Sequence, residues 1–235
     1  MSALSLLAMA AYVICSILVC RHRRRTGGAR CGWGKSALMP LLALFVWASL
    51  YSPLRFVLTG RKIPANPLPE DAAYLFVIAG LLFGCLGDSL LEIGGKWYGP
   101  GAGAFLVGHL CYLHAAGIQI RAGGGVKAPM FLLALFYLIP VVTAGRALLA
   151  SVRGLIRIGM AAYMAAILAM SFSMLLRFGL VPLPAFVCCF AGSIFFLVSD
   201  GWIGYHAFLG RDGNGIMETY TIAQALLALG FVLAM

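Results

Sequence analysis

Two carboxylates in this chain could do chemistry together, because both end long apolar runs. The runs that lead to Asp88 and Asp200 each begin with Ala-Gly and reach the aspartate nine positions after that alanine. A carboxylate at membrane depth costs about 3 kcal/mol or more, so such a residue is a functional-site candidate. The matching contexts predict a paired-acid site inside a helical membrane bundle. The simpler alternative is that each aspartate marks a helix end near the membrane surface.

Other polar side chains fall inside apolar runs at spacings that place them on one side of a helix. They are His109 and Tyr112, three residues apart, and Tyr220 and Gln224, four residues apart. We expect His109 to take part in a site, because another polar group shares its face. Glu92 lies one turn after Asp88 and would either repel it or be a solvated loop residue, and we favour the loop.

The composition excludes a soluble domain. The chain has 235 residues, of which 63% are hydrophobic and 10% are charged, whereas about a quarter of the residues in soluble domains are charged. A net charge of +10 in such a protein reports topology and contact with anionic lipid, not binding of nucleic acid. We therefore expect a multi-pass integral membrane protein, which in a bacterium would lie in the cell membrane.

Eight apolar segments approach the length of about 20 residues that a spanning helix needs. We expect them at Ala3–Cys20, Ala37–Leu58, Ala72–Ile93, Ala102–Ile120, Pro129–Leu149, Leu155–Leu176, Val181–Gly204 and Ile216–Ala234. Short loops rich in Gly, Pro and charge separate them, and no linker is long enough to divide domains. The predicted fold class is therefore all-α, a polytopic membrane bundle that forms a single eight-helix transmembrane domain over residues 1–235.

The distribution of basic residues sets the expected orientation of these helices. The loops after the first, third, fifth and seventh helices, with their flanks, carry 11 of the 17 Lys and Arg residues, and the other loops carry six. Both termini should then be non-cytoplasmic. Asp88 and Asp200 end the third and seventh helices, which run in the same direction. Both carboxylates should therefore lie near one membrane face, which the charge count makes the cytoplasmic one.

The likeness of the two aspartate-containing runs also suggests an internal repeat. The two aspartates are 112 residues apart, which is almost half the chain. Four helices per half is an even number, so the halves would be two parallel four-helix repeats. Chance similarity between apolar helices is the alternative, and both interpretations stay open.

The sequence contains no recognisable metal or nucleotide motif. None of its seven cysteines forms a C-x-x-C pair, so it predicts neither a zinc framework nor a disulfide framework. We expect no cofactor and no metal. The metal-dependent alternative is a zinc hydrolase with His109, Asp88 and Asp200 as ligands, although one histidine is few for such a site.

Several short motifs together resemble the YhhN/TMEM86 family of membrane proteins, whose characterised members are lysoplasmalogenases. The motifs are Gly87-Asp88-x-x-Leu91, Gly108-His109-x-x-Tyr112, Ser199-Asp200 and Tyr220-x-x-x-Gln224, with Lys35 before the second span. They occur in the order that the family shows, from Lys35 onward. This chain departs from the family in its arginine-rich segment after the first span and in the residues that directly follow Asp88.

The resemblance implies eight spans, an essential aspartate pair at Asp88 and Asp200, and hydrolysis of the vinyl ether bond of lysoplasmalogens. The products would be a fatty aldehyde and a glycerophospho-base. Two carboxyls suit this reaction, because one in its protonated form can protonate the vinyl carbon while the other activates water. The same division of roles serves glycosidases. We expect Asp88 to be the acid and Asp200 the base.

The other polar residues would bind the substrate, a lysophospholipid taken from the bilayer. Those expected to orient water and the glycerol hydroxyl are His109, Tyr112, Tyr220, Gln224 and Ser199. Lys35 and the arginines after the first span could meet the phosphate. Two other classes of protein stay open. One is a small-molecule or proton-coupled transporter with intramembrane aspartates, and the other is a structural bundle whose aspartates only pack.

Overall fold

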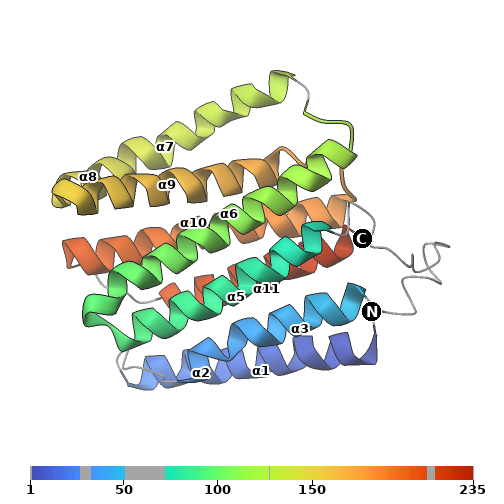
Figure 1. Ribbon diagram of the computed structural model, residues 1–235, viewed down its shortest axis with the longest axis horizontal. Helices are drawn as coiled ribbons and strands as arrows, with labels where there is room; N and C mark the ends of the chain where they lie inside the picture. The colour runs from blue at the N-terminus through green and yellow to red at the C-terminus, as the bar shows by residue number, and fades with distance from the viewer. Residues whose placement is uncertain (1, 27–32, 51–71, 127, 211–214, 235) are drawn as a thin grey trace.

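The protein is a bundle of long helices packed side by side, as a computed structural model shows (Figure 1). The structure describes residues 2–26, 33–50, 72–126, 128–210 and 215–234. Every regular element within these ranges is helical. The all-α prediction is therefore confirmed for the described part of the chain.

The helices follow the apolar segments of the sequence. In chain order they are α1 (Ala3–Arg25), α2 (Trp33–Ser36), α3 (Leu38–Leu50), α5 (Ala72–Ile93), η2 (Gly95–Trp97), α6 (Tyr98–Ala122), η3 (Ala128–Tyr137), α7 (Leu138–Pro140), η4 (Val141–Gly145), α8 (Arg146–Ser151), α9 (Gly154–Leu175), α10 (Leu183–Leu209) and α11 (Ile216–Leu233). Among the described residues, seven helical segments are long and apolar enough to cross a membrane: α1, α5, η2 with α6, η3 through α8, α9, α10 and α11. They match seven of the eight expected spans, as a multi-pass integral membrane protein requires.

The second expected span is described only in part. A shorter apolar helix covers Gly34–Leu50, and residues 51–58 of the expected range lie outside the described residues. The fifth span, η3 through α8, is irregular, with 3₁₀ turns before Leu138 and a π-helical turn at Val141–Gly145. Pro140 lies just before that π-helical turn and lacks the N–H that a regular α-helix would use there.

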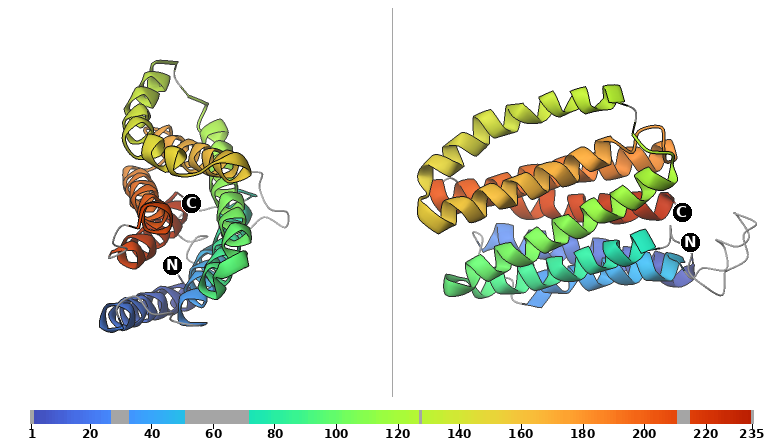
Figure 2. Two further views of the ribbon diagram at one scale, coloured as in Figure 1. Left: turned by 90° about the vertical axis from the view of Figure 1, so that its left-hand side faces the viewer. Right: turned by 45° about the horizontal axis from the view of Figure 1, so that its top comes forward.

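The directions of the helices place both aspartates toward the same end of the bundle. α1, α5 and α10 run in one direction, and α6, α9 and α11 run in the other (Figure 1). Asp88 is five residues from the end of α5, and Asp200 is in the C-terminal half of α10. The shared end predicted for the two carboxylates is therefore confirmed. α1 begins and α11 ends at the opposite end of the bundle (Figure 2), whereas the cytoplasmic assignment stays a prediction.

Glycines let the helices that carry the aspartates approach their neighbours closely. A Cβ on Gly80 of α5 would lie 3.2 Å from the carbonyl oxygen of Gly108 on α6, and the reverse contact has the same distance. A Cβ on Gly192 of α10 would lie 3.0 Å from the carbonyl oxygen of Ala223 on α11. Small residues at such contacts favour tight packing of membrane helices. Gly80 and Gly192 stand at matching positions, yet an internal repeat stays a prediction.

Two ion pairs attach the C-terminal end of α1 to its neighbours. Arg23 pairs with Glu92 on α5 at 3.0 Å, and Arg24 pairs with Glu218 on α11 at 2.6 Å. The expectation that Glu92 is a solvated loop residue is wrong, because Glu92 lies within α5 and its side chain is 11% exposed. Arg23 and Arg24 therefore bind neighbouring helices in addition to flanking the first span.

Candidate functional site

Asp200 lies in a cluster of three polar side chains from three helices. The hydroxyl of Tyr163 on α9 donates a hydrogen bond to Oδ2 of Asp200. Nε2 of His109 on α6 lies 3.2 Å from the same oxygen and 3.2 Å from the Tyr163 hydroxyl. The side chains of His109 and Asp200 are 1% and 7% exposed. A carboxyl, an imidazole and a phenol held together in this way can pass a proton to a bound molecule.

Asp88 lies in a second polar cluster, with Lys35 and Tyr220. Nζ of Lys35 forms an ion pair with Oδ1 of Asp88 at 2.8 Å, and the Tyr220 hydroxyl donates to Oδ2 at 2.8 Å. The Lys35 ammonium also lies 5.5 Å from the centroid of the Tyr220 ring. Asp88 is fully buried, and a buried carboxylate needs such a partner to offset the loss of water. The lysine that we expected at the substrate phosphate is thus engaged by Asp88.

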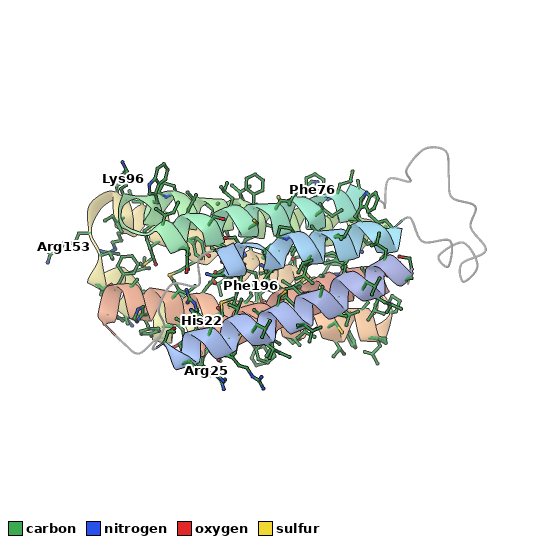
Figure 3. All side chains as sticks on the ribbon, turned by 90° about the horizontal axis from the view of Figure 1, so that it is seen from below. His22, Arg25, Phe76, Lys96, Arg153 and Phe196 are labelled. Atoms are coloured by element: carbon green, nitrogen blue, oxygen red, sulfur yellow. The ribbon has the colours of Figure 1, made fainter. Side chains whose placement is uncertain are left out.

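Aromatic rings join the two clusters. Phe196 packs edge-on against the rings of both His109 and Tyr220, at centroid distances of 4.8 and 5.7 Å. Phe105 packs edge-on against Tyr220 at 6.0 Å. Phe196 lies inside the bundle (Figure 3). Because Phe196 contacts one ring of each cluster, the clusters form one buried region in which each carboxylate has its own partners.

Three other predicted site residues have different partners. The Tyr112 hydroxyl donates to Oε1 of Gln224 at 2.7 Å, and both side chains are buried. The Ser199 hydroxyl donates to the carbonyl oxygen of Ile216 at 3.2 Å, which ties α10 to the first residue of α11. These bonds fix helix positions around the site, and in the described residues they do not lead directly to either aspartate.

An apolar cavity of about 390 Å³ lies beside Asp200. Most of its wall comes from α6, α9 and α10, with a smaller part from η4, and its polar side chains are those of Asp200, Tyr163 and Tyr98. Phe105, which contacts the Asp88 cluster through Tyr220, is also part of the wall, but Asp88 is not. The sequence led us to expect two acids facing each other across one pocket. The described cavity instead reaches one of them.

Tyr163 is the residue of the Asp200 cluster that sequence reasoning missed. It lies ten positions into α9, away from the helix ends where interfacial tyrosines gather. Its position far from the ends of the apolar run was the one feature of the sequence that could have indicated a site residue, because a phenol inside a membrane helix needs a hydrogen-bond partner. No spacing rule links it to Asp200, since the two residues come from different helices.

His109, Asp88 and Asp200, the residues of the alternative zinc site, do not form one three-residue group in the structure. In the described residues, no group of three His, Cys, Asp or Glu side chains is placed to hold a metal ion. His109 lies against Asp200, whereas the partners of Asp88 are Lys35 and Tyr220. The six cysteines in the described ranges are free.

A family model for the YhhN family matches residues 33–231, which is most of the chain. The chain belongs to the YhhN family. Both polar clusters and the whole cavity wall lie within the matched residues, whereas α1 precedes them. The ion pairs of α1 with Glu92 and Glu218 therefore join residues outside the match to residues within it. Comparison with curated proteins and with solved structures gives no match.

Proposed function

We propose that this YhhN protein is a lysoplasmalogenase, which hydrolyses the vinyl ether bond of a lysoplasmalogen to a fatty aldehyde and a glycerophospho-base. The family includes lysoplasmalogenases. The observation that carries the proposal is the position of Asp200, which lies in the wall of an apolar cavity and contacts Tyr163 and His109. A proton donor beside a space for hydrocarbon is what a vinyl ether hydrolase needs.

The first proposed step is protonation of the vinyl carbon that does not carry the oxygen. Asp200 in its acid form gives up the proton, and the electron pair of the double bond forms the new C–H bond. The ether oxygen then shares a positive charge with its neighbouring carbon, as in an oxocarbenium ion. Tyr163 and His109 both contact Oδ2 of Asp200. They would hold the carboxyl in place while Oδ1 meets the substrate.

The second proposed step is addition of water to the cationic carbon. Asp200, now a carboxylate, accepts a proton from that water and becomes an acid again. The resulting hemiacetal collapses when its hydroxyl loses a proton and the ether oxygen gains one, which breaks the C–O bond. One water is consumed, Asp200 ends in its starting form, and no cofactor takes part.

Asp88 has an electrostatic role in this scheme. It does not line the cavity, and Lys35 balances its charge. Without the Asp88 carboxylate, the Lys35 ammonium would stand uncompensated near the developing cation and would oppose it. The expected order, with Asp88 as acid and Asp200 as base, therefore gives way to a proposal in which Asp200 carries both proton transfers.

The substrate would enter from the bilayer as a lysophospholipid. Its hydrocarbon chain suits the apolar cavity wall, and its vinyl ether would lie at Asp200. The orienting roles expected for Tyr112, Tyr220, Gln224 and Ser199 stay predictions.

The test is hydrolysis of 1-alkenyl-glycerophosphoethanolamine by the purified protein in D2O. We expect fatty aldehyde with one deuterium on the carbon next to the carbonyl, because the first step delivers a solvent-derived proton there. Asp200→Asn should reduce aldehyde release by a factor of about 100 or more. Glu218→Gln removes a carboxylate at the same end of the bundle but outside both clusters, and it should match the wild type.

A different outcome would favour the transporter. If the wild-type protein releases no aldehyde and instead moves a solute across sealed vesicles in a manner that depends on Asp200, the proposed function is wrong.

A further inference from the structure

The cavity beside Asp200 has a wall that is unusually rich in glycine. Six of the residues that line it are Gly99, Gly103, Gly145, Gly159, Gly201 and Gly204. At Gly99, Gly103, Gly159 and Gly201, an added Cβ would meet no atom within 4 Å. A larger side chain at these positions would therefore project into open space beside or within the cavity.

These open glycines differ from the glycines that pack helices together. At Gly80 and Gly108 a Cβ would press on a backbone carbonyl at 3.2 Å, so helix packing explains why no side chain is present. Glycine is a poor helix former, and no neighbouring atom excludes a side chain at Gly103 or Gly159. The absence of a side chain at Gly103 and Gly159 therefore leaves space open at the cavity wall.

The positions of Gly103 and Gly159 suggest where the cavity opens. Gly103 is five residues after the start of α6, and Gly159 is five residues after the start of α9. The two helices start apart at the same end of the bundle and come together further along, where they contact each other (Figure 1). Both glycines are exposed although both line the cavity. The cavity therefore reaches the lateral surface of the bundle between α6 and α9, where the bilayer lies.

We propose that the cavity binds a single unbranched hydrocarbon chain, which lies between α6 and α9, and that Gly103 and Gly159 determine how much of the chain it accepts. The inference rests on the proposed function for the group at the polar end of the bound chain, which is a vinyl ether held at Asp200. A volume of about 390 Å³ is at the low end for ligand pockets, which span roughly 300–1,000 Å³, and it favours one chain over two. Beyond Tyr163, the deeper part of the α9 wall is apolar: Met164, Ile167 and Leu168.

The test compares substrates that differ only in chain length. Gly159→Leu and Gly103→Leu should each lower kcat/KM for the longest alkenyl chains by about tenfold, because the new side chain displaces roughly two buried methylenes. The shortest chains should be cleaved at nearly the wild-type rate, since they do not need the lost space. Gly117→Leu is the matched control on α6, because it lies outside the cavity wall and its Cβ would meet only the end of the Arg121 side chain, at 3.6 Å.

A second measurement separates this inference from the proposed function. Binding of 1-alkyl-glycerophosphocholines, which lack the vinyl bond and cannot be cleaved by this chemistry, is followed by thermal shift across the same chain lengths. Selective loss of long-chain binding in Gly159→Leu supports the chain site even if the wild type releases no aldehyde. The inference is overturned if the folded Gly103→Leu and Gly159→Leu proteins bind all chain lengths with equally reduced affinity, or if they bind every chain length as the wild type does. Gly159→Ala serves in the same assays if the larger side chain prevents folding.

Discussion

Nζ of Lys35 lies 2.8 Å from Oδ1 of Asp88, and the two side chains are 10% and 0% exposed. This ion pair makes Asp88 and Asp200 unequal, because the polar partners of Asp200 are a tyrosine and a histidine. Removing one member of a buried ion pair costs about 3–5 kcal/mol, whereas replacing both with neutral side chains is often tolerated. The pair therefore offers a direct way to separate the roles of the two aspartates.

Asp88→Asn should lower both the melting temperature and aldehyde release, because it leaves the Lys35 ammonium without its partner. The double variant Asp88→Asn with Lys35→Met should recover most of both, since it removes the two charges together. Melting temperature and initial rate in the same detergent are the measurements. If the double variant is folded but as inactive as Asp200→Asn, Asp88 takes part directly in the chemistry.

Tyr163→Phe should reduce kcat by about 10- to 100-fold while the protein stays folded. The change removes the hydroxyl that donates to Asp200, and a hydrogen bond to a charged group contributes about 1.5–3 kcal/mol. Tyr137→Phe is the matched control, because the Tyr137 hydroxyl contacts Ser171 outside both clusters. Equal rates for the two variants would show that Tyr163 does not position the carboxyl.

Gly80→Ala should destabilise the bundle by about 1–3 kcal/mol, the usual cost of overpacking. Its Cβ would lie 3.2 Å from the Gly108 carbonyl oxygen and 3.3 Å from the Tyr112 ring. Gly117→Ala on α6 faces only the flexible end of Arg121 and should melt close to the wild type. Thermal unfolding of the two variants in one detergent compares them. A Gly80→Ala protein that melts with the control would show that α5 and α6 can separate at little cost.

Glu92→Gln should lower the melting temperature more than Glu218→Gln does. The Arg23–Glu92 side chains are 26% and 11% exposed, whereas those of Arg24 and Glu218 are 75% and 25% exposed. An exposed ion pair contributes at most about 1 kcal/mol and is screened by salt. Melting curves at low and high salt test this order. Equal shifts for the two variants would mean that burial does not distinguish the pairs.

The local pattern of the sequence was sufficient for the helical class, for most of the spans and for the shared end of the two aspartates. Long apolar runs indicate spanning helices because the bilayer core fixes their length. Alternating direction then places Asp88 and Asp200 without knowledge of any contact. The rarity of polar side chains in such runs also drew attention to His109 and Tyr220, whereas Lys35 stood out through the resemblance to the family.

Only the tertiary structure decided which of these groups meet. The same apolar pattern allows many rotations and neighbours for a helix, and the chosen ones depend on close contacts such as Gly80 with Gly108. Those contacts bring Lys35 to Asp88, bring Tyr163 to Asp200, and leave the cavity beside Asp200 alone. The sequence does not show which side chains on different helices meet, because the distance between them is set by lateral packing of the helices and not by spacing along the chain.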